Sequence, residues 1–272
     1  MLSIYRGNAI HNSIRSMVEY ELDYSMTVTL IAEVDLSEIE KLREKLGAER
    51  PSYTAFVVKA LALALRDFPY ANQRVVRGRF FPLLSSRIQK FSQSDVAVAT
   101  ERDLPGVTNV ASIDILRSAE NLSLPAINGI LRRLAQSDES TNENWKKQKY
   151  FMTARPRWLF RFLSKFPNWF PKAWVDYRGG AAVVSSPAKY GADTLVTSWS
   201  WPIGVSFGFV KERPVVKDRN VVACPTFNLI LNFDRRIMAG AQAGRFFARI
   251  KEYLENPHLL TSGLAECDHP PK

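Results

Sequence analysis

The chain has 272 residues, of which 46% are hydrophobic and 24% are charged. This composition excludes a disordered protein and allows one large α/β domain or two small ones. The formal net charge is +10 and the pI is about 9.7, which favours anionic partners such as phosphate-bearing cofactors or acidic membrane surfaces. No recognisable nucleic-acid-binding motif accompanies the charge, so we expect no nucleic-acid partner.

Cysteine and histidine usage argues against a metal centre. The two cysteines, Cys224 and Cys267, lie far apart and have no ligand-type spacing, and the chain has only three histidines. The N-terminal residues lack the apolar core of a signal peptide, and no stretch reaches the ~18 uncharged apolar residues of a membrane span. We therefore expect no metal and a cytoplasmic location.

The first half of the chain opens with a strand and two helices. Residues 24–34 alternate apolar and polar side chains, which predicts a half-buried strand. Asp35 begins a helix with acidic residues early and basic residues late, and Gly47 ends it. Ser52 is the N-cap of a second helix that is apolar on almost every side, so we expect this helix inside the protein.

Later segments alternate between strands and helices without a regular βαβ order. Short β-like pieces follow up to residue 100, and residues 112–136 contain a helix that we expect to be interrupted or offset near Pro125. Three β-like segments and an amphipathic helix over 241–254 follow Gly180. This order predicts a mixed β-sheet with helices packed on one side. We expect a single domain over 1–260 with a basic and aromatic insertion at about 142–178, followed by a polar C-terminal tail over 261–272.

Several segments together resemble the catalytic domain of dihydrolipoamide acyltransferases and the related chloramphenicol acetyltransferases. The segment NFDRRIMAGAQAGRFFARIKEYLENP, residues 232–257, resembles a family signature in which Asp-His-Arg-x-x-Asp-Gly ends a strand and precedes a helix. Residues 51–73, the opening strand and helix, GGAAVVSS and FGFVKERPVV resemble further family segments in the same order. The resemblance implies a chloramphenicol acetyltransferase-like fold, an α+β two-layer sandwich.

The resemblance also implies a mechanism. In this family three identical subunits assemble, and each active site lies in a channel between neighbours. An acyl thioester such as acyl-CoA enters from one end and the acceptor from the other. A histidine removes the acceptor proton, and a hydroxyl of the neighbouring subunit donates a hydrogen bond to the tetrahedral oxyanion. We therefore expect a homotrimer, a coenzyme A thioester as substrate and no covalently bound cofactor.

The family motif is only partly present. Asp234 and Arg236 match it, and Ser185 lies where the family has its hydroxyl, which makes it the candidate oxyanion donor. Arg235 replaces the catalytic histidine and Ala239 replaces the second acidic residue. Arginine stays protonated and accepts no proton, so the general-base step is lost unless another group supplies it. We expect Asp234 to be structural and to pair with Arg236.

Two functions remain open. One is a free-standing acyltransferase that uses Ser185 and an acceptor already deprotonated, and the other is an inactive homologue that binds an acyl or CoA ligand or acts as a trimeric scaffold. Arg235 either binds a carboxylate or phosphate group or only fills space. His11 is the one histidine near a conceivable active site, and as an N-terminal residue it is more typical of a surface.

The insertion has three interpretations. Trp158, Leu159, Phe162, Leu163 and Phe166 fall on one helical face, with basic residues on the other. Such a segment lies on an anionic membrane as a peripheral contact through 155–174, covers a long acyl chain, or packs on the parent domain or a neighbouring subunit. Prolines at 156, 167 and 171 divide it into short pieces.

Overall fold

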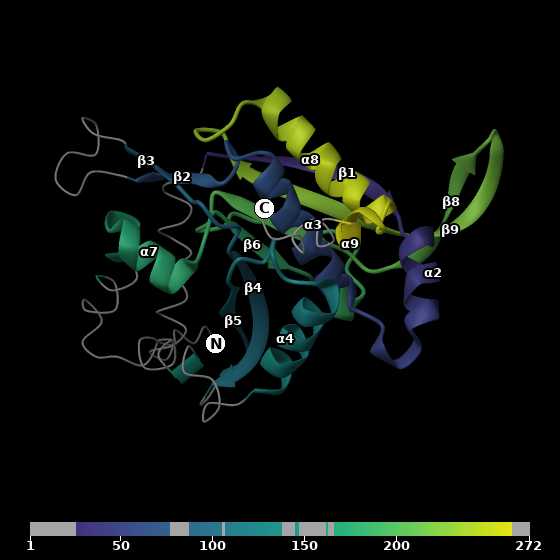
Figure 1. Cartoon of the computed structure of the whole chain (residues 1–272), viewed down its shortest axis with the longest axis horizontal. Helices are drawn as coiled ribbons and strands as arrows, with labels where there is room; N and C mark the ends of the chain where they lie inside the picture. Colours follow the sequence, from purple (N-terminus) through teal and green to yellow (C-terminus); the bar gives the residue numbers. More distant parts are fainter. Residues whose placement is uncertain are drawn as a thin grey trace, which may run out of the picture.

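A computed structural model describes residues 26–76, 87–104, 107–137, 145–146, 162 and 166–262. Its centre is a seven-stranded sheet in the order β1-β9-β7-β6-β4-β5, with β8 paired to β9 (Figure 1). The strands are β1 (Thr27–Asp35), β4 (Val96–Leu104), β5 (Val107–Leu116), β6 (Ala182–Ser185), β7 (Ile203–Phe207), β8 (Lys211–Lys217) and β9 (Asn220–Asp234). A separate two-stranded sheet pairs β2 (Gln73–Val76) with β3 (Arg87–Lys90).

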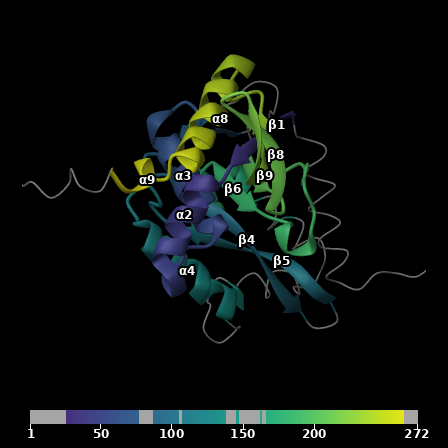
Figure 2. The same cartoon turned by 90° about the vertical axis from the view of Figure 1, so that its right-hand side faces the viewer.

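The main sheet is mixed. β6 runs parallel to β4 and to β7, and the other neighbouring strands of the sheet are antiparallel. The four long helices lie over one face of this sheet, as Figures 1 and 2 show. They are α2 (Ser37–Leu46), α3 (Tyr53–Asp67), α4 (Leu124–Gln136) and α8 (Gly240–Glu255). The predicted two-layer arrangement is therefore confirmed. No helix among the described residues is long and apolar enough to cross a membrane.

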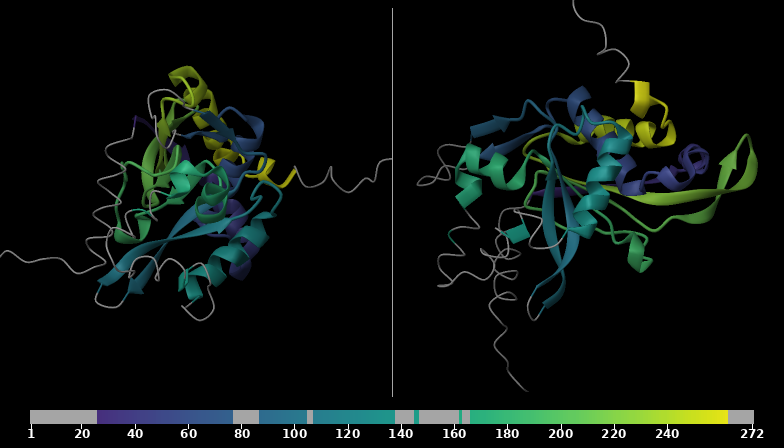
Figure 3. Two further views of the ribbon diagram at one scale, coloured as in Figure 1. Left: turned by 90° about the vertical axis from the view of Figure 1, so that its left-hand side faces the viewer. Right: turned by 60° about the horizontal axis from the view of Figure 1, so that its bottom comes forward.

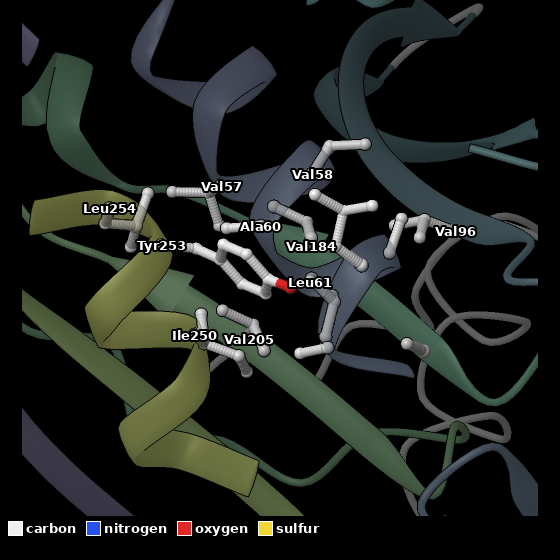
Figure 4. Packing of buried hydrophobic residues seen from close by; sticks show 14 of the residues in the cluster. Val57, Val58, Ala60, Leu61, Val96, Val184, Val205, Ile250, Tyr253 and Leu254 are labelled. Atoms are coloured by element: carbon white, nitrogen blue, oxygen red, sulfur yellow. The ribbon is translucent and has the colours of Figure 1, made fainter. Parts of the chain in front are cut away.

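Helix α3 occupies the middle of the helical layer. Every residue from Ala55 to Leu65 is buried, and apolar side chains of β4, β6, β7 and α8 surround the helix (Figure 4). Ser52 caps it, because its hydroxyl accepts a hydrogen bond of 3.3 Å from the Ala55 amide. The apolar pattern that predicts an interior helix is thus confirmed, together with its cap.

Most predicted elements lie where the sequence places them. Helix α2 ends at Gly47, whose φ of +52° is the left-handed region that favours glycine. The helix predicted within 112–136 is α4, which begins only at Leu124, because residues up to Leu116 belong to strand β5. Pro125 lies in the first turn of α4 and does not interrupt it, because the first turn of a helix needs no amide donor there.

The second face of the sheet carries a smaller apolar cluster. Trp174 of the short helix α7 (Pro171–Arg178) and Trp201 pack with Val183 and Ala97, which point away from α3. Trp199 lies so close to Gly204 in β7 that a Cβ there would come within 1.9 Å of its ring. This face therefore also has a helix and a loop over part of it. Two short helical turns, η1 (Gly47–Glu49) and η2 (Ala188–Tyr190), and the C-terminal α9 (Leu259–Ser262) complete the described elements.

Lys59 is the one cation in the buried part of α3. Its side chain is 1% exposed, and its ammonium donates hydrogen bonds of 2.8 and 2.7 Å to the carbonyl oxygens of Glu120 and Leu122. Burial, with a smaller contribution from the charge of Arg66, lowers the pKa of Lys59 to about 8. Lys59 thus joins α3 to the segment before α4 at an electrostatic cost.

This cost predicts a pH dependence of stability. Lysine in the unfolded chain stays protonated up to its ordinary pKa of about 10.4, whereas folded Lys59 loses its proton near 8. Between these values the unfolded state binds more protons, so the contribution of Lys59 to the free energy of unfolding rises with pH. Lys59→Met removes this rise. Urea unfolding of both proteins from about pH 7.5 to about pH 9.5 measures it, and parallel pH curves would contradict the assignment.

Candidate functional site

The turn after β9 carries the residues that match the family motif. The Asp234 amide donates a hydrogen bond of 2.8 Å to the carbonyl of Pro202, which fixes the end of β9 beside the start of β7. The Asp234 carboxylate accepts hydrogen bonds from the amide and from the guanidinium of Arg236, and this pairing raises the pKa of Arg236. Asp234 is therefore engaged within the turn, by the partner that the sequence predicts for a structural role.

Arg235 lies in the same turn with its side chain exposed to solvent. Its amide donates a hydrogen bond of 3.0 Å to the carbonyl of Met26, at the start of β1. Its guanidinium makes no hydrogen bond or ion pair with the described residues. The Arg235 guanidinium keeps its positive charge, so it attracts anions and does not take up a proton.

The turn is held in place by residues that follow α3 and by the first turn of α8. The Gln73 side chain donates a hydrogen bond of 3.0 Å to the carbonyl of Ile237, and Tyr70 donates one of 3.1 Å to the carbonyl of Gln242. The Gln242 side chain accepts a hydrogen bond of 2.9 Å from the Ala239 amide, at the start of α8. The position of Arg235 thus depends on the C-terminal end of α3.

Ser185 is the last residue of β6. It is half-buried, it pairs with Ser206 of β7, and its hydroxyl makes no hydrogen bond with the described residues. The next residue differs, because the Ser186 hydroxyl donates to the carbonyl of Phe207 at 2.8 Å and accepts from the Ala188 amide at 3.2 Å. Of the two neighbouring serines, Ser186 holds the backbone together and Ser185 keeps a free donor.

One chain does not bring Ser185 and Arg235 together. Ser185 pairs with Ser206 at the end of β7, whereas the Asp234 amide bonds Pro202, just before β7 begins. Four residues along an extended strand span about 13 Å, and β6 and β9 flank β7 on opposite sides. This separation is too large for both side chains to contact one reacting carbonyl group. Within one chain the two residues therefore lie at separate places.

A cavity of about 990 Å³ lies between strand β4 and helices α2, α3 and α4. Val98 of β4 is part of its wall, and the N-terminal end of α3 and the turn before it form the opposite wall. Three arginines line it, with Glu44 as the single acidic residue among the described lining residues; the arginines are Arg43, Arg50 and Arg132. The cavity is therefore cationic and open to solvent, and Ser185 is not among its lining residues.

The three arginines differ in how much of their charge is already paired. Arg43 forms an ion pair of 2.9 Å with Glu40, and Arg132 donates weak bonds of 3.5 and 3.3 Å to the carbonyls of Ala48 and Arg50. The Arg50 side chain is exposed and makes no hydrogen bond or ion pair with the described residues. Arg50 is thus the arginine most available to an anionic ligand.

A buried ion pair supports the floor of the cavity. Arg102 and Asp114, which are 6% and 2% exposed, pair at 2.8 Å between β4 and β5. Asp114 also accepts a hydrogen bond of 2.7 Å from Thr100, a lining residue, and Arg102 donates to the carbonyl of Ser137 after α4. This network ties the sheet to α4 and keeps Thr100 in place.

Sequence reasoning identified Ser185, Asp234 and Arg235 but missed the cavity. Its arginines come from segments as far apart as residues 43 and 132, so no local spacing reveals them. His11 lies outside the described residues. In the part of the chain that the structure describes, no group of three or more histidine, cysteine and acidic side chains is placed to hold a metal ion.

Comparisons with known proteins identify the family and the fold of the chain. The family model for 2-oxoacid dehydrogenases acyltransferase (catalytic domain) matches residues 9–146 and 175–262. The chain is 26% identical over 236 residues to a lipoamide acyltransferase component of the branched-chain alpha-keto acid dehydrogenase complex of Pseudomonas aeruginosa, covering 85% of this chain and 46% of that protein. It spans about half the length of the curated relatives it matches.

Two solved structures show the same fold at low identity. The dihydrolipoamide acetyltransferase of Azotobacter vinelandii, in which a serine, a histidine and an asparagine were studied for their catalytic roles, aligns with a TM-score of 0.70 at 15% identity, covering 96% of this chain and 94% of that one. A chloramphenicol acetyltransferase aligns with a TM-score of 0.52 at 10% identity, covering 93% and 100%. Because the family model matches well over half of the residues, the chain belongs to the family of 2-oxoacid dehydrogenase acyltransferase catalytic domains.

Proposed function

We propose that the protein transfers an acyl group from a thioester donor of the acyl-CoA type to a thiol acceptor, at sites shared between neighbouring subunits of a homotrimer. The observation that carries this proposal is that the Ser185 hydroxyl makes no hydrogen bond with the described residues, while the neighbouring strand β4 is part of a cavity lined by three arginines. Family membership supports the reaction class. The register supports a shared site, because Ser185 and Arg235 of one chain lie too far apart to act on the same carbonyl.

In this proposal the reaction needs no general base on the protein. The acceptor enters as a thiolate and attacks the thioester carbonyl, forming a new carbon–sulfur bond and a tetrahedral oxyanion. The Ser185 hydroxyl of one subunit donates a hydrogen bond to that oxyanion. Collapse expels the thiolate of the donor, which takes a proton from solvent. Arg235 of the neighbouring subunit stabilises the acceptor thiolate, because a nearby cation lowers the pKa of a thiol.

The arginine-lined cavity is proposed as the donor site. A coenzyme A thioester carries phosphate groups, and the cavity has three arginines in its wall. Arginine binds phosphate oxygens in bidentate geometry, and Arg50 has its charge free to do so.

A second function is favoured by one specific observation. Arg235 cannot accept a proton, so the cavity and the trimer then serve an inactive homologue that binds an acyl or CoA ligand or acts as a scaffold. Both functions require the ligand-binding cavity or the assembly, and only the first requires turnover.

Thiol release from acyl-CoA in the presence of a dithiol acceptor tests the role of position 235. We expect wild-type turnover to rise with pH as the acceptor thiol ionises, and Arg235→Ala to lower it at least about tenfold below the pKa of that thiol. Arg235→His is expected to add turnover near neutral pH, because imidazole is a base there. Arg245→Ala is the control, because Arg245 is an exposed arginine of α8 outside the turn of Arg235.

The outcomes separate the two functions. Wild-type turnover that survives Arg235→Ala unchanged would show that this position does no chemistry. Turnover that appears only in Arg235→His identifies an inactive active site in the native protein. Absence of acyl-CoA binding by calorimetry in wild type and in Arg235→His favours the scaffold.

Subunit mixing tests whether the site is shared. Ser185→Ala and Arg235→Ala are each expected to be impaired alone. When they are unfolded and refolded together, random trimers regain both residues at about one quarter of their sites, so activity returns to about a quarter of wild type. Refolding the two variants separately and then combining them is the control. If the co-refolded trimers form normally and recover no activity, the two residues do not complete one site between neighbouring subunits, and the shared site is wrong.

Arg50 gives a test of the donor site. Arg50→Ala should raise the KM for acyl-CoA about five- to tenfold, because one free charge-assisted contact to phosphate is lost. The KM for an acyl-pantetheine, which lacks the nucleotide phosphates, should not change. Arg133→Ala, an exposed arginine of α4 that does not line the cavity, is the control. Equal effects on both donors would contradict a phosphate contact.

A further inference from the structure

Four aromatic side chains form a cluster in front of and at the start of α7. They are Phe162, Phe166, Trp169 and Phe170, and we refer to them as the aromatic surface. Their rings contact one another, with centroid separations of 6.2 Å for Phe162–Phe166, 5.8 Å for Phe162–Trp169 and 4.5 Å for Phe166–Phe170. Phe162 is 41% exposed and Phe170 is 37% exposed. Large apolar side chains thus gather at the surface instead of in the core.

The aromatic surface is fixed to the domain from below. Trp174 is 2% exposed, and its indole donates a hydrogen bond of 3.0 Å to the carbonyl of Gly180. The guanidinium of Arg74, itself 3% exposed, lies 4.2 Å from the centre of the Trp174 ring and donates to the carbonyls of Asn168 and Pro167. Trp174 is therefore packed on the domain beneath the aromatic surface. The rings of the aromatic surface are presented on a fixed base.

The charge of the protein is concentrated in the same part of the sequence. Residues 145–174 contain eight lysines and arginines and no acidic residue. The remaining 242 residues contain 29 lysines and arginines against 27 acidic residues, so they are almost neutral. Lys172 is exposed in the first turn of α7, directly after Phe170. The positive charge of the chain is thus a property of the segment that carries the aromatic surface.

The family model places this segment outside the common fold. It matches the chain up to residue 146 and again from 175, and leaves 147–174 unmatched. The core between the sheet and its four long helices consists of side chains from the matched parts. Exposed aromatic rings outside that core are typical of an interaction surface.

We propose that the aromatic surface docks the protein on a membrane of anionic phospholipid. Phenylalanine and tryptophan rings enter the boundary between headgroups and acyl chains, where tryptophan is favoured. Lysine and arginine without neighbouring carboxylates draw the same segment to negative headgroups. A protein partner with an apolar face explains the rings but gives no reason for eight cations without one acidic residue. This inference does not depend on the proposed acyl transfer.

Sedimentation with vesicles tests the proposal on the full chain. We expect wild type to bind vesicles of phosphatidylglycerol mixed with phosphatidylcholine, to bind pure phosphatidylcholine at least about tenfold more weakly, and to be released by high salt. Phe162→Ser together with Phe170→Ser should weaken binding to the anionic vesicles at least about tenfold, because both side chains already lie at the surface and their loss leaves the core unchanged.

The control variant removes two apolar side chains that are more exposed and lie elsewhere on the surface. Val216 and Val221 are 68% and 71% exposed on the β8–β9 hairpin, which projects from the other end of the molecule from α7 (Figures 1 and 3). Val216→Ser with Val221→Ser should leave vesicle binding unchanged. Equal losses in both double variants would overturn the proposal, as would absence of binding or equal binding to neutral vesicles.

A change of oligomeric state gives a further decisive outcome. If Phe162→Ser with Phe170→Ser breaks the wild-type assembly in light scattering while the hairpin variant does not, the aromatic surface is an interface between subunits and the membrane proposal is wrong. An unchanged assembly with lost vesicle binding supports it. Thiol release from a soluble acyl-CoA, measured in the same variants, shows whether acyl transfer is separate from docking.

Discussion

Helix α3 sets the distance between the arginine-lined cavity and the turn of Arg235. Its apolar side chains meet the sheet and α8, so the helix is fixed along its whole length, and 15 residues of α-helix span about 22 Å. Its N-terminal end forms part of the wall of the arginine-lined cavity. Its C-terminal end continues into Tyr70 and Gln73, which hold the turn of Arg235. Helix α3 is therefore a rigid link between the cavity and the turn of Arg235 within one chain.

The cavity and the turn carry positive charge for different reasons. At the cavity, three arginines and one acidic residue are among the described lining residues. At the turn, the carboxylate of Asp234 is occupied by Arg236, so the free charge that remains there is the guanidinium of Arg235. Positive charge at both places lowers the pKa of any neutral base between them, which disfavours a mechanism that needs a general base. The same charge favours anionic substrates at both places, whether these are converted or only bound.

Local patterns predicted the elements that depend on their own side chains. The alternation of β1, the cap and apolar run of α3, and Gly47 after α2 are each visible in consecutive residues, and each is confirmed. The start of the helix within 112–136 could not be fixed from the sequence, because apolar residues of strand β5 precede those of α4. Pro125 marks the N-terminal end of α4 and does not break it. The cavity could not be predicted, since it depends on how α2, α3 and α4 meet. The contrast between Ser185 and Ser186 also needs the structure, because it rests on which hydroxyl the backbone uses.

The turn of Arg235 cannot by itself distinguish an active enzyme from an inactive one. Ile237 and Met238, in the same turn, are buried in the core, and the turn leads into α8, so packing alone requires its shape. The Asp234–Arg236 pair stabilises that shape in either case. The free hydroxyl of Ser185 and the unpaired charge of Arg50 are different, because no contact within the described chain uses them. These two groups are therefore available to a ligand, whereas Asp234 and Arg236 already bind each other within the turn.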